Sequence, residues 1–253
     1  MSAPYIIDDT RPIQLGLIVL QADETIEQDM RILMSPDVEY MVSRVRSGTS
    51  VTSDTLREMA DNLTEAAGLL PRGAHMACVA YACTSGTAEI GTTRIADLVD
   101  AGVDTPCVTD PVTALIAACK HLGIKRLGLL SPYIESVSDR LRDVLAGAGI
   151  QVVAFTSFDE PIEERVVRIT AQSIINSARD LGRDTELDAI FLSCTNLRTL
   201  SVIPEIEAAR NMPVLSSNLV LAWHMAQLAQ VPLAANLPFR LTTPATTPVV
   251  SFQ

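Results

Sequence analysis

The sequence predicts an α/β protein made of two similar lobes. Short aliphatic runs alternate with longer amphipathic stretches, which is typical of βα units around parallel sheets. Two segments also repeat one another, since VAYACTSG around Cys83 and IFLSCTNL around Cys194 each combine an aliphatic strand, Cys-Thr and then polar or small residues. The repeat indicates a duplicated unit with a cysteine at the same place in each copy.

Seven segments are predicted to be buried strands, because they are short, aliphatic and bounded by turn residues. They are residues 14–20, 77–83, 106–109, 126–130, 151–155, 188–193 and 213–216. Each cysteine strand is followed by one further short strand with a polar end and then by an apolar helix. The duplication therefore extends well beyond the two cysteine motifs.

The helices are predicted from apolar residues at helical spacing and from signals at the helix ends. Thr55 and Glu58 form a capping box ahead of an apolar stripe that runs to about residue 70. Ser136 and Asp139 open another helix, which ends at Gly147. Further helices are expected over residues 112–122, 161–181 and 219–228.

The lobes are expected to share a tight interface, because no low-complexity linker separates them. We assign residues 1–116 and 217–253 to the N-terminal lobe, with the last helix and the tail, and residues 117–216 to the C-terminal lobe. The final stretch from Pro232 is rich in Pro and Thr without a helical period, so it is predicted to be a tail on the surface.

Composition and charge exclude several classes of partner. A formal net charge of -11 repels phosphate backbones and anionic lipids, so neither nucleic acid nor membrane is an expected partner. The N-terminus has no basic region followed by an apolar one, and the apolar runs are short, which favours a cytoplasmic protein. Gln21 to Glu24, rather than a glycine-rich loop, follow the first strand, which disfavours a nucleotide cofactor.

The five cysteines are an odd number without any CxxC pair, which fits neither a disulfide framework nor a zinc site, so we expect no metal. Cys78 lies within a predicted strand, Cys107 begins one, and Cys119 lies inside a helix. These three are predicted to be packing residues. Cys83 and Cys194 instead end their strands, where open α/β sheets bind ligands. The alternative is that all five are small buried hydrophobic residues.

The residues that follow the two strand-end cysteines supply backbone N–H groups at a turn into the next element. They are Thr84 and Ser85 in the first copy, and Thr195 and Asn196 in the second. Such groups stabilise a thiolate, a carboxylate or an enolate. Two thiols on opposite sides of a carbon suit a racemase or epimerase, whereas a thiolate that adds to a double bond beside a proton donor suits a cis-trans isomerase.

Five segments resemble the maleate cis-trans isomerase and arylmalonate decarboxylase branch of the Asp/Glu racemase superfamily. They are GLIVLQADETIE, YACTSGT, LLSPYIESVSDRL, FLSCTNLRTL and PVLSSNLVLAW, and the resemblance reaches about residue 230. It implies two pseudo-symmetric lobes, each with a four-stranded parallel sheet flanked by helices, and an active site between them. It also implies an enzyme without cofactors that forms a homodimer or a higher homo-oligomer.

The resemblance implies roles for three residues. In maleate isomerases the first cysteine is the nucleophile and the second the proton donor, which correspond to Cys83 and Cys194. Arylmalonate decarboxylases keep only the second cysteine, so Cys83 disfavours that activity. The family's tyrosine in its SPY segment, which binds the substrate carboxylate, corresponds to Tyr133.

Two positions depart from the family. Asp23 and Glu163 stand where maleate isomerases carry asparagines, and an ionised carboxylate repels a dicarboxylate but attracts an ammonium or amidinium group. Asp23 has a second interpretation, as the cap of the helix that follows it. Among the branches, the sequence most resembles the ectoine-utilisation protein A group, whose associated solutes carry an amidinium and a carboxylate. We therefore expect a small carboxylate or a zwitterion as substrate.

Four functions stay open from the sequence. The leading hypothesis is a racemase, epimerase or cis-trans isomerase acting next to a carboxylate, in ectoine or hydroxyectoine degradation. The others are a maleate isomerase proper, a cysteine-dependent decarboxylase or lyase, and a protein that binds a small molecule without catalysis.

Overall fold

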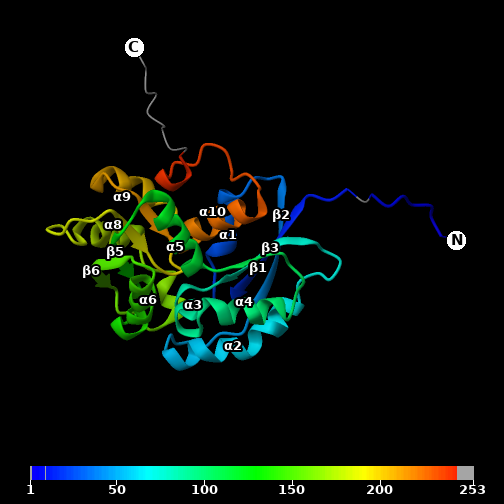
Figure 1. Cartoon of the computed structure of the whole chain (residues 1–253), viewed down its shortest axis with the longest axis horizontal. Coiled ribbons are helices and arrows are strands. Elements are labelled where there is room, and N and C mark those ends of the chain that lie inside the picture. Colours follow the sequence, from blue (N-terminus) through cyan, green and yellow to red (C-terminus); the bar gives the residue numbers. More distant parts are fainter. Residues whose placement is uncertain (1, 9, 244–253) are drawn as a thin grey trace, which may run out of the picture.

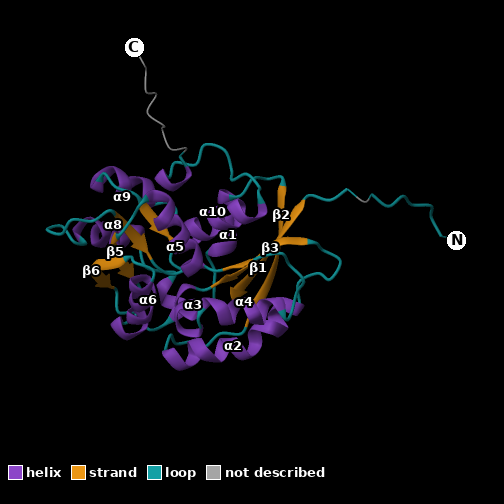
Figure 2. Ribbon diagram, in the orientation of Figure 1, coloured by secondary structure: helices purple, strands orange, loops and turns teal. Residues whose placement is uncertain are grey.

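A computed structural model of the chain describes residues 2–8 and 10–243, in which two four-stranded parallel sheets are flanked by helices (Figures 1 and 2). The strand order is β2-β1-β3-β4 in the first sheet and β6-β5-β7-β8 in the second, so the two sheets repeat one topology. The predicted α/β fold class is confirmed. The strands are β1 (Ile13–Leu20), β2 (Val38–Val45), β3 (Met76–Ala82), β4 (Val108–Thr109), β5 (Arg126–Ser131), β6 (Gln151–Ser157), β7 (Ala189–Leu192) and β8 (Val214–Ser216).

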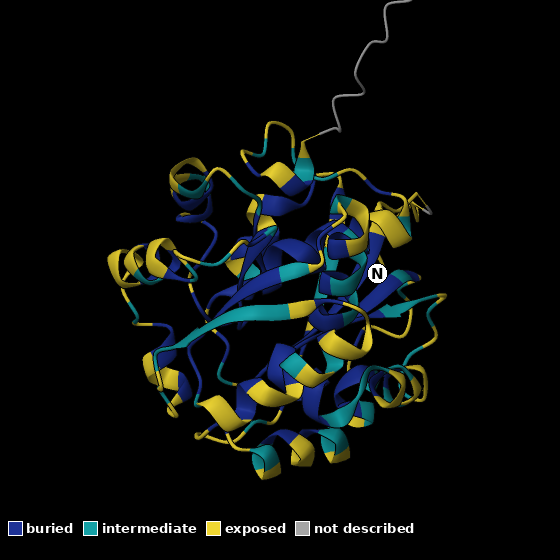
Figure 3. Cartoon of the chain, turned by 60° about the vertical axis from the view of Figure 1, so that its left-hand side comes forward, coloured by how far each residue is buried: buried dark blue, intermediate teal, exposed yellow. Residues whose placement is uncertain are grey.

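Helices connect successive strands and cover the sheets, as parallel strands require. The inner strands are buried and aliphatic along nearly their whole length, because both of their faces are covered (Figure 3). The helices are α1 (Ile26–Leu33), α2 (Ser53–Gly68), α3 (Thr84–Ile90), α4 (Thr92–Asp100), α5 (Pro111–Leu122), α6 (Glu135–Gly147), α7 (Glu163–Val166), α8 (Ala171–Asp180), α9 (Ile203–Arg210) and α10 (Ser217–Ala229), followed by the 3-10 turn η1 (Arg240–Thr242).

The last helix returns to the first half of the molecule. Helix α10 packs against α5, β3 and α1, and it also contacts β8, which precedes it. The predicted lobe boundary at residue 116 falls inside α5. The division of the chain into lobes stays a prediction.

A buried ion pair joins helices from the two halves. The Glu89 side chain on α3 is almost fully buried, and it pairs with Arg57 on α2 and, at 3.5 Å, with Arg140 on α6. Helix α3 packs against both of these helices. The interface beside the first cysteine is therefore held by charge as well as by apolar packing.

Strand β2 is not predicted by the sequence pattern. Its residues alternate irregularly between buried and exposed, because β2 is the edge strand of the first sheet and carries polar side chains such as Glu39 and Arg44. All seven predicted strands are present, with ends that shift by at most two residues.

Three helix ends differ from the predictions. Helix α2 begins at Ser53, and its capping box joins Thr52 to Thr55 rather than Thr55 to Glu58. Helix α6 begins at Glu135 without a side-chain cap. The helix expected over residues 161–181 is two helices, α7 and α8, because Thr170 accepts a hydrogen bond from the Ser173 N–H and starts a new helix there.

The C-terminal segment packs on the molecule as far as it is described. Leu233 forms a β-bridge with Met34, and Phe239 and Leu241 are buried. The rest of the predicted tail, residues 244–253, lies outside the described residues. Within the described part of the chain, no helix combines the length and the apolar character needed to cross a membrane.

Candidate active site

Cys83 follows β3 directly and is the N-terminal cap of α3. Its Sγ accepts a hydrogen bond from the Gly86 N–H at 3.2 Å, and the side chain is buried. Gly86 must lack a side chain, because a Cβ there would lie 2.9 Å from the sulfur and 2.5 Å from the Tyr81 hydroxyl. The Cys-Thr-Ser-Gly sequence therefore folds the backbone closely around the first thiol.

Cys194 follows β7, at the equivalent place in the second sheet. Its φ of 92° lies in a region that side chains other than glycine rarely adopt, which indicates a backbone held by its surroundings. The sulfur accepts a hydrogen bond from the Asn196 N–H at 3.3 Å and lies 2.8 Å from the Tyr133 hydroxyl. No helix starts at this cysteine, because α9 begins only at Ile203.

A hydrogen-bonded chain leads away from the second thiol. The Tyr133 hydroxyl donates to Glu163 Oε2 at 2.8 Å, and the Asn196 side-chain amide donates to Glu163 Oε1 at 3.1 Å. Tyr133, Glu163 and Asn196 are all buried. The predicted site residues Cys194, Tyr133, Glu163 and Asn196 therefore form one connected group.

Asp23 follows β1, and its two carboxylate oxygens have different surroundings. Its Oδ1 accepts hydrogen bonds from the Thr25 and Ile26 N–H groups at the start of α1, as a capping carboxylate does, although Thr25 is the N-cap residue and the helix begins at Ile26 rather than near Glu24. Its Oδ2 is buried and has no hydrogen-bond partner among the described residues. The predicted contact of Asp23 with a substrate stays a prediction.

The remaining predicted residues join the loops to one another. The Thr195 hydroxyl donates to the Ala82 carbonyl at 3.3 Å, directly before Cys83, and the Thr84 hydroxyl lies 2.7 Å from that of Ser217. Ser85 is buried in the first turn of α3. These contacts bring the loop after β3 against the loop after β7.

Two residues that were not predicted, Asn218 and Asp29, also hold these loops together. The Asn218 side-chain amide donates to Asp29 Oδ2 at 2.7 Å and to the Thr195 carbonyl at 2.8 Å. Both side chains are buried. The polar end of the VLSSN strand was the available signal for Asn218, whereas Asp29 reads as an ordinary charged helix residue in the sequence.

Burial dominates the electrostatics of the site. It raises the pKa of Cys83 to about 12 and the pKa of Cys194 well above its usual value. Burial likewise raises the pKa values of Asp23 and Glu163. The charge of Glu163 and, less strongly, that of Asp23 raise the pKa of each thiol further. The protonation of the two thiols is therefore coupled to that of the two carboxyls.

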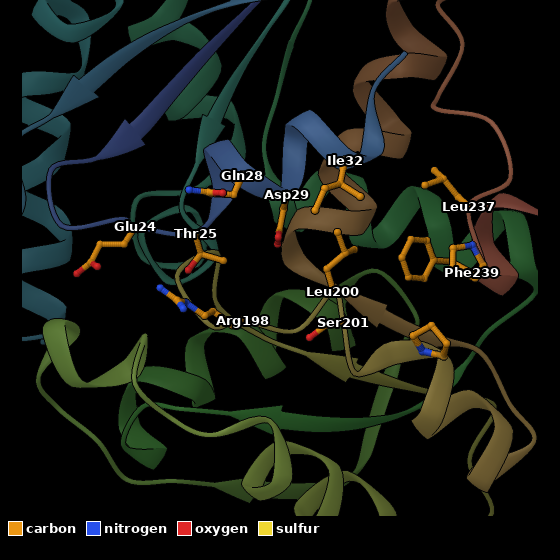
Figure 4. A pocket seen from close by; sticks show the side chains of 12 residues that line it. Glu24, Thr25, Gln28, Asp29, Ile32, Arg198, Leu200, Ser201, Leu237 and Phe239 are labelled. Carbon is orange, nitrogen blue, oxygen red and sulfur yellow. The ribbon is translucent and has the colours of Figure 1, made fainter. Parts of the chain in front are cut away.

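A cavity of about 550 Å³ adjoins the loop after β1 (Figure 4). Its polar side holds Glu24, Thr25, Asp29 and Arg198, and its apolar side includes Phe239. Neither cysteine lines this cavity. Because the Glu24 N–H donates to the Asn196 side-chain oxygen, the cavity borders the residues that carry the second thiol.

Two four-stranded parallel sheets of one topology, each with a cysteine after the strand that lies third in its order, define the Asp/Glu racemase-like fold. Residues 15–241 match the arylmalonate decarboxylase family, and the chain belongs to it. The family resemblance predicted from the sequence is confirmed, whereas the resemblance to the ectoine-utilisation group stays a prediction.

Individual relatives carry two different activities. The arylmalonate decarboxylase of Bordetella bronchiseptica is 31% identical over 125 residues, which cover 49% of this chain and only 52% of that protein. The maleate isomerase of Geobacillus stearothermophilus is 24% identical over 220 residues, which cover 81% of this chain and 86% of that enzyme.

Solved structures agree with the fold. A maleate isomerase variant from Pseudomonas putida with maleate superposes with a TM-score of 0.82 at 22% identity, covering 92% of this chain and 98% of that one. A cysteine-to-serine variant of the maleate cis-trans isomerase of Nocardia farcinica, with a covalently bound succinylcysteine intermediate, superposes with a TM-score of 0.76 at 21% identity, covering 87% and 94%.

Proposed function

We propose that this protein is a cofactor-independent isomerase that uses Cys83 and Cys194 at a carbon next to a carboxylate. The observation that carries the proposal is the equivalent placement of two buried thiols at the ends of β3 and β7, each with its sulfur held by a backbone N–H. Burial raises the pKa of both thiols, and the charges of Glu163 and Asp23 raise it further in each case, so the two thiols lie near the same two carboxyls.

The reaction that suits this arrangement is addition and elimination across a double bond. The Cys83 thiolate would form a carbon–sulfur bond to one alkene carbon, the π electrons would move toward the adjacent carboxylate, and the Cys194 thiol would protonate the other carbon. The resulting single bond can rotate. Return of that proton to Cys194 and loss of the Cys83 thiolate would give the other isomer. The succinylcysteine intermediate in the Nocardia farcinica enzyme supports this order of events.

Racemisation is the close alternative within the same proposal. One thiolate would remove a proton from one face of the carbon, and the opposite thiol would deliver a proton to the other face. Decarboxylation is the second candidate function, because the Bordetella bronchiseptica relative is a decarboxylase. The presence of Cys83 favours isomerisation over it.

The substrate is proposed to carry a cationic nitrogen in addition to its carboxylate, as the solutes of ectoine or hydroxyectoine degradation do. The free Oδ2 of Asp23 supports this, because a buried carboxylate oxygen without a partner is costly unless a ligand satisfies it. Exchange of Asp23 for Asn, which has the same shape, should weaken binding of ammonium or amidinium compounds and improve binding of dicarboxylates such as maleate. If the wild type and the Asp23→Asn variant show the same preference between cationic compounds and dicarboxylates, the proposal of a cationic substrate is contradicted.

One experiment separates the candidate functions. The protein is incubated in deuterated water with maleate, arylmalonates, amino acids, ectoine and hydroxyectoine, and the products are followed by NMR and mass spectrometry. Isomerisation gives a product of the same skeleton that carries deuterium next to the carboxylate, whereas decarboxylation releases CO₂. Thermal stabilisation by a ligand without any reaction would indicate a binding protein and contradict the proposal.

Two further properties stay predictions of the sequence. A homodimer or higher homo-oligomer is tested by light scattering of the purified protein, and a monomer would contradict it. The cytoplasmic location is tested by fractionation of the cells that produce the protein.

A further inference from the structure

The Tyr133 hydroxyl has one proton and two polar neighbours. Its oxygen lies 2.8 Å from Glu163 Oε2 and 2.8 Å from Cys194 Sγ. A carboxylate oxygen accepts hydrogen bonds and cannot donate one, so the Tyr133 O–H donates its hydrogen bond to an ionised Glu163. The tyrosine oxygen is then left as an acceptor, and the only proton that can fill the contact with the sulfur is the S–H proton of Cys194.

A backbone N–H donor is common to both thiols. Cys83 Sγ accepts the Gly86 N–H and Cys194 Sγ accepts the Asn196 N–H, and each contact lowers the pKa of its thiol against the effect of burial. The two thiols differ in Tyr133, whose hydroxyl lies against Cys194 and is tied to the Glu163 carboxyl.

We infer that the Glu163 carboxylate, acting through Tyr133, keeps Cys194 in its protonated form and so makes it the acid of the thiol pair. Glu163 is a positioning residue in this scheme, since it contacts Tyr133 and Asn196 and reaches the sulfur only through the hydroxyl. No proton leaves the group: the S–H bond stays intact until the reaction uses it. The inference rests on the proposed function, because it assigns a role within that site.

The groups that face Glu163 act in both directions on its ionisation. Burial and the nearby Asp23 charge raise the pKa of Glu163, whereas the hydrogen bonds from Tyr133 and Asn196 lower it and favour the ionised carboxylate. Toward the sulfurs, the Glu163 charge raises the pKa of both Cys194 and Cys83, and only Cys194 is joined to it by a hydrogen-bonded hydroxyl. Neutralising Glu163 should therefore change Cys194 more than Cys83.

The test is the pH dependence of cysteine alkylation by iodoacetamide between pH 7 and 11, resolved for each cysteine by peptide mass spectrometry. In Glu163→Gln the amide can donate to Tyr133, whose O–H then turns to the sulfur and supports the thiolate. We expect Cys194 to react roughly 10-fold faster at a given pH below its midpoint, because removal of a nearby like charge lowers a pKa by about one unit or more. The exposed neighbour variant Glu164→Gln should leave the rate unchanged.

A second pair of variants covers the possibility that Glu163→Gln does not fold. Glu163→Asp and Glu163→Asn have nearly the same size and differ in charge, so only the Asn variant should accelerate Cys194 alkylation. An unchanged or higher midpoint in both neutral variants, or an equal shift at Cys83, would overturn the inference. The assay uses no substrate, so its outcome is separate from that of the isomerase assay.

Discussion

The loops around Cys83 and Cys194 occupy equivalent places in two sheets of the same topology, yet they surround the two thiols with different backbone conformations and different side chains. Each sulfur accepts a backbone N–H group, but Cys83 has extended backbone and caps a helix. Cys194 has a positive φ, leads into a long loop, and lies against a tyrosine that is tied to a buried carboxyl. The repeated topology therefore places a thiol at the same position in each sheet, whereas the different loops give the two thiols different backbone conformations and different hydrogen-bond partners.

The sharpest way to test this difference is to replace each thiol by a hydroxyl. We expect Cys83→Ser and Cys194→Ser each to lower turnover roughly 1,000-fold or more, because serine has a far higher pKa and is a poor nucleophile. The two should differ in mass spectra of the intact protein: Cys194→Ser accumulates a covalent substrate adduct, whereas Cys83→Ser forms none.

The control for this comparison uses the buried cysteines that lie away from the site. Cys78→Ser and Cys119→Ser should lower the melting temperature and keep the activity, because both side chains are packed inside the protein. Equal loss of turnover in all four variants would mean that the repeated position of the thiols has no catalytic meaning.

The loop after Cys83 needs a glycine at position 86, whereas the loop after Cys194 contains no glycine before α9. Gly86→Ala would bring a methyl group within 2.9 Å of Cys83 Sγ, so we expect both lower activity and a loss of about 1–3 kcal/mol in the free energy of unfolding. Gly147→Ala at the end of α6 meets no atom within 4 Å and should be neutral or slightly stabilising. Chemical denaturation of both variants checks this.

The hydrogen bond between Asn218 and Asp29 is predicted to make the stability of the fold depend on pH. Burial raises the pKa of Asp29 to about 6 in the folded protein, above its ordinary value of 3.8. The folded state therefore holds the Asp29 proton more tightly than the unfolded state, and stability falls as the pH rises from about 4 to about 6. Asp29→Asn should remove that fall and gain up to about 3 kcal/mol at pH 7.

Measurement of the free energy of unfolding from pH 4 to 8 tests this coupling. The wild type and the Asp29→Asn variant should diverge as the pH rises and should run parallel above about pH 7. A constant difference over the whole range would show that Asp29 does not titrate on folding. Loss of stability in the variant at pH 7 would show that the ionised carboxylate is needed by Asn218.

The smallest expected effect concerns α3, which follows Cys83 and has no counterpart directly after Cys194. Glu89→Ala removes the buried partner of Arg57 and Arg140, whose own side chains stay solvated, and should cost about 1–2 kcal/mol. Glu135→Ala, which removes an exposed partner of Arg142, should cost less than about 0.5 kcal/mol. Equal melting temperatures for the two variants would contradict a structural role for the buried pair.

The sequence by itself determined the duplication, the α/β class and the positions of the two thiols. Aliphatic strands covered on both faces carry a strong local pattern, and the end of such a strand is fixed by where the pattern stops. Strand β2 was not predicted for the same reason, since this edge strand carries both polar and apolar side chains and lacks a continuous aliphatic run. The prediction of one helix over residues 161–181 was wrong, because Thr170 caps a new helix and the segment forms α7 and α8.

Only the tertiary structure decided how the site residues are used. The hydrogen bond from Tyr133 to Glu163, the hydrogen bond from Asn196 to Glu163, and the bridge of Asn218 to Asp29 all join residues whose partners depend on how segments far apart in the sequence meet. A hydrogen bond is set by distances of a few tenths of an ångström between such loops, and no local pattern encodes these distances. The sequence supplied two thiols, whereas the packing of the loops around them determined that they are not equivalent.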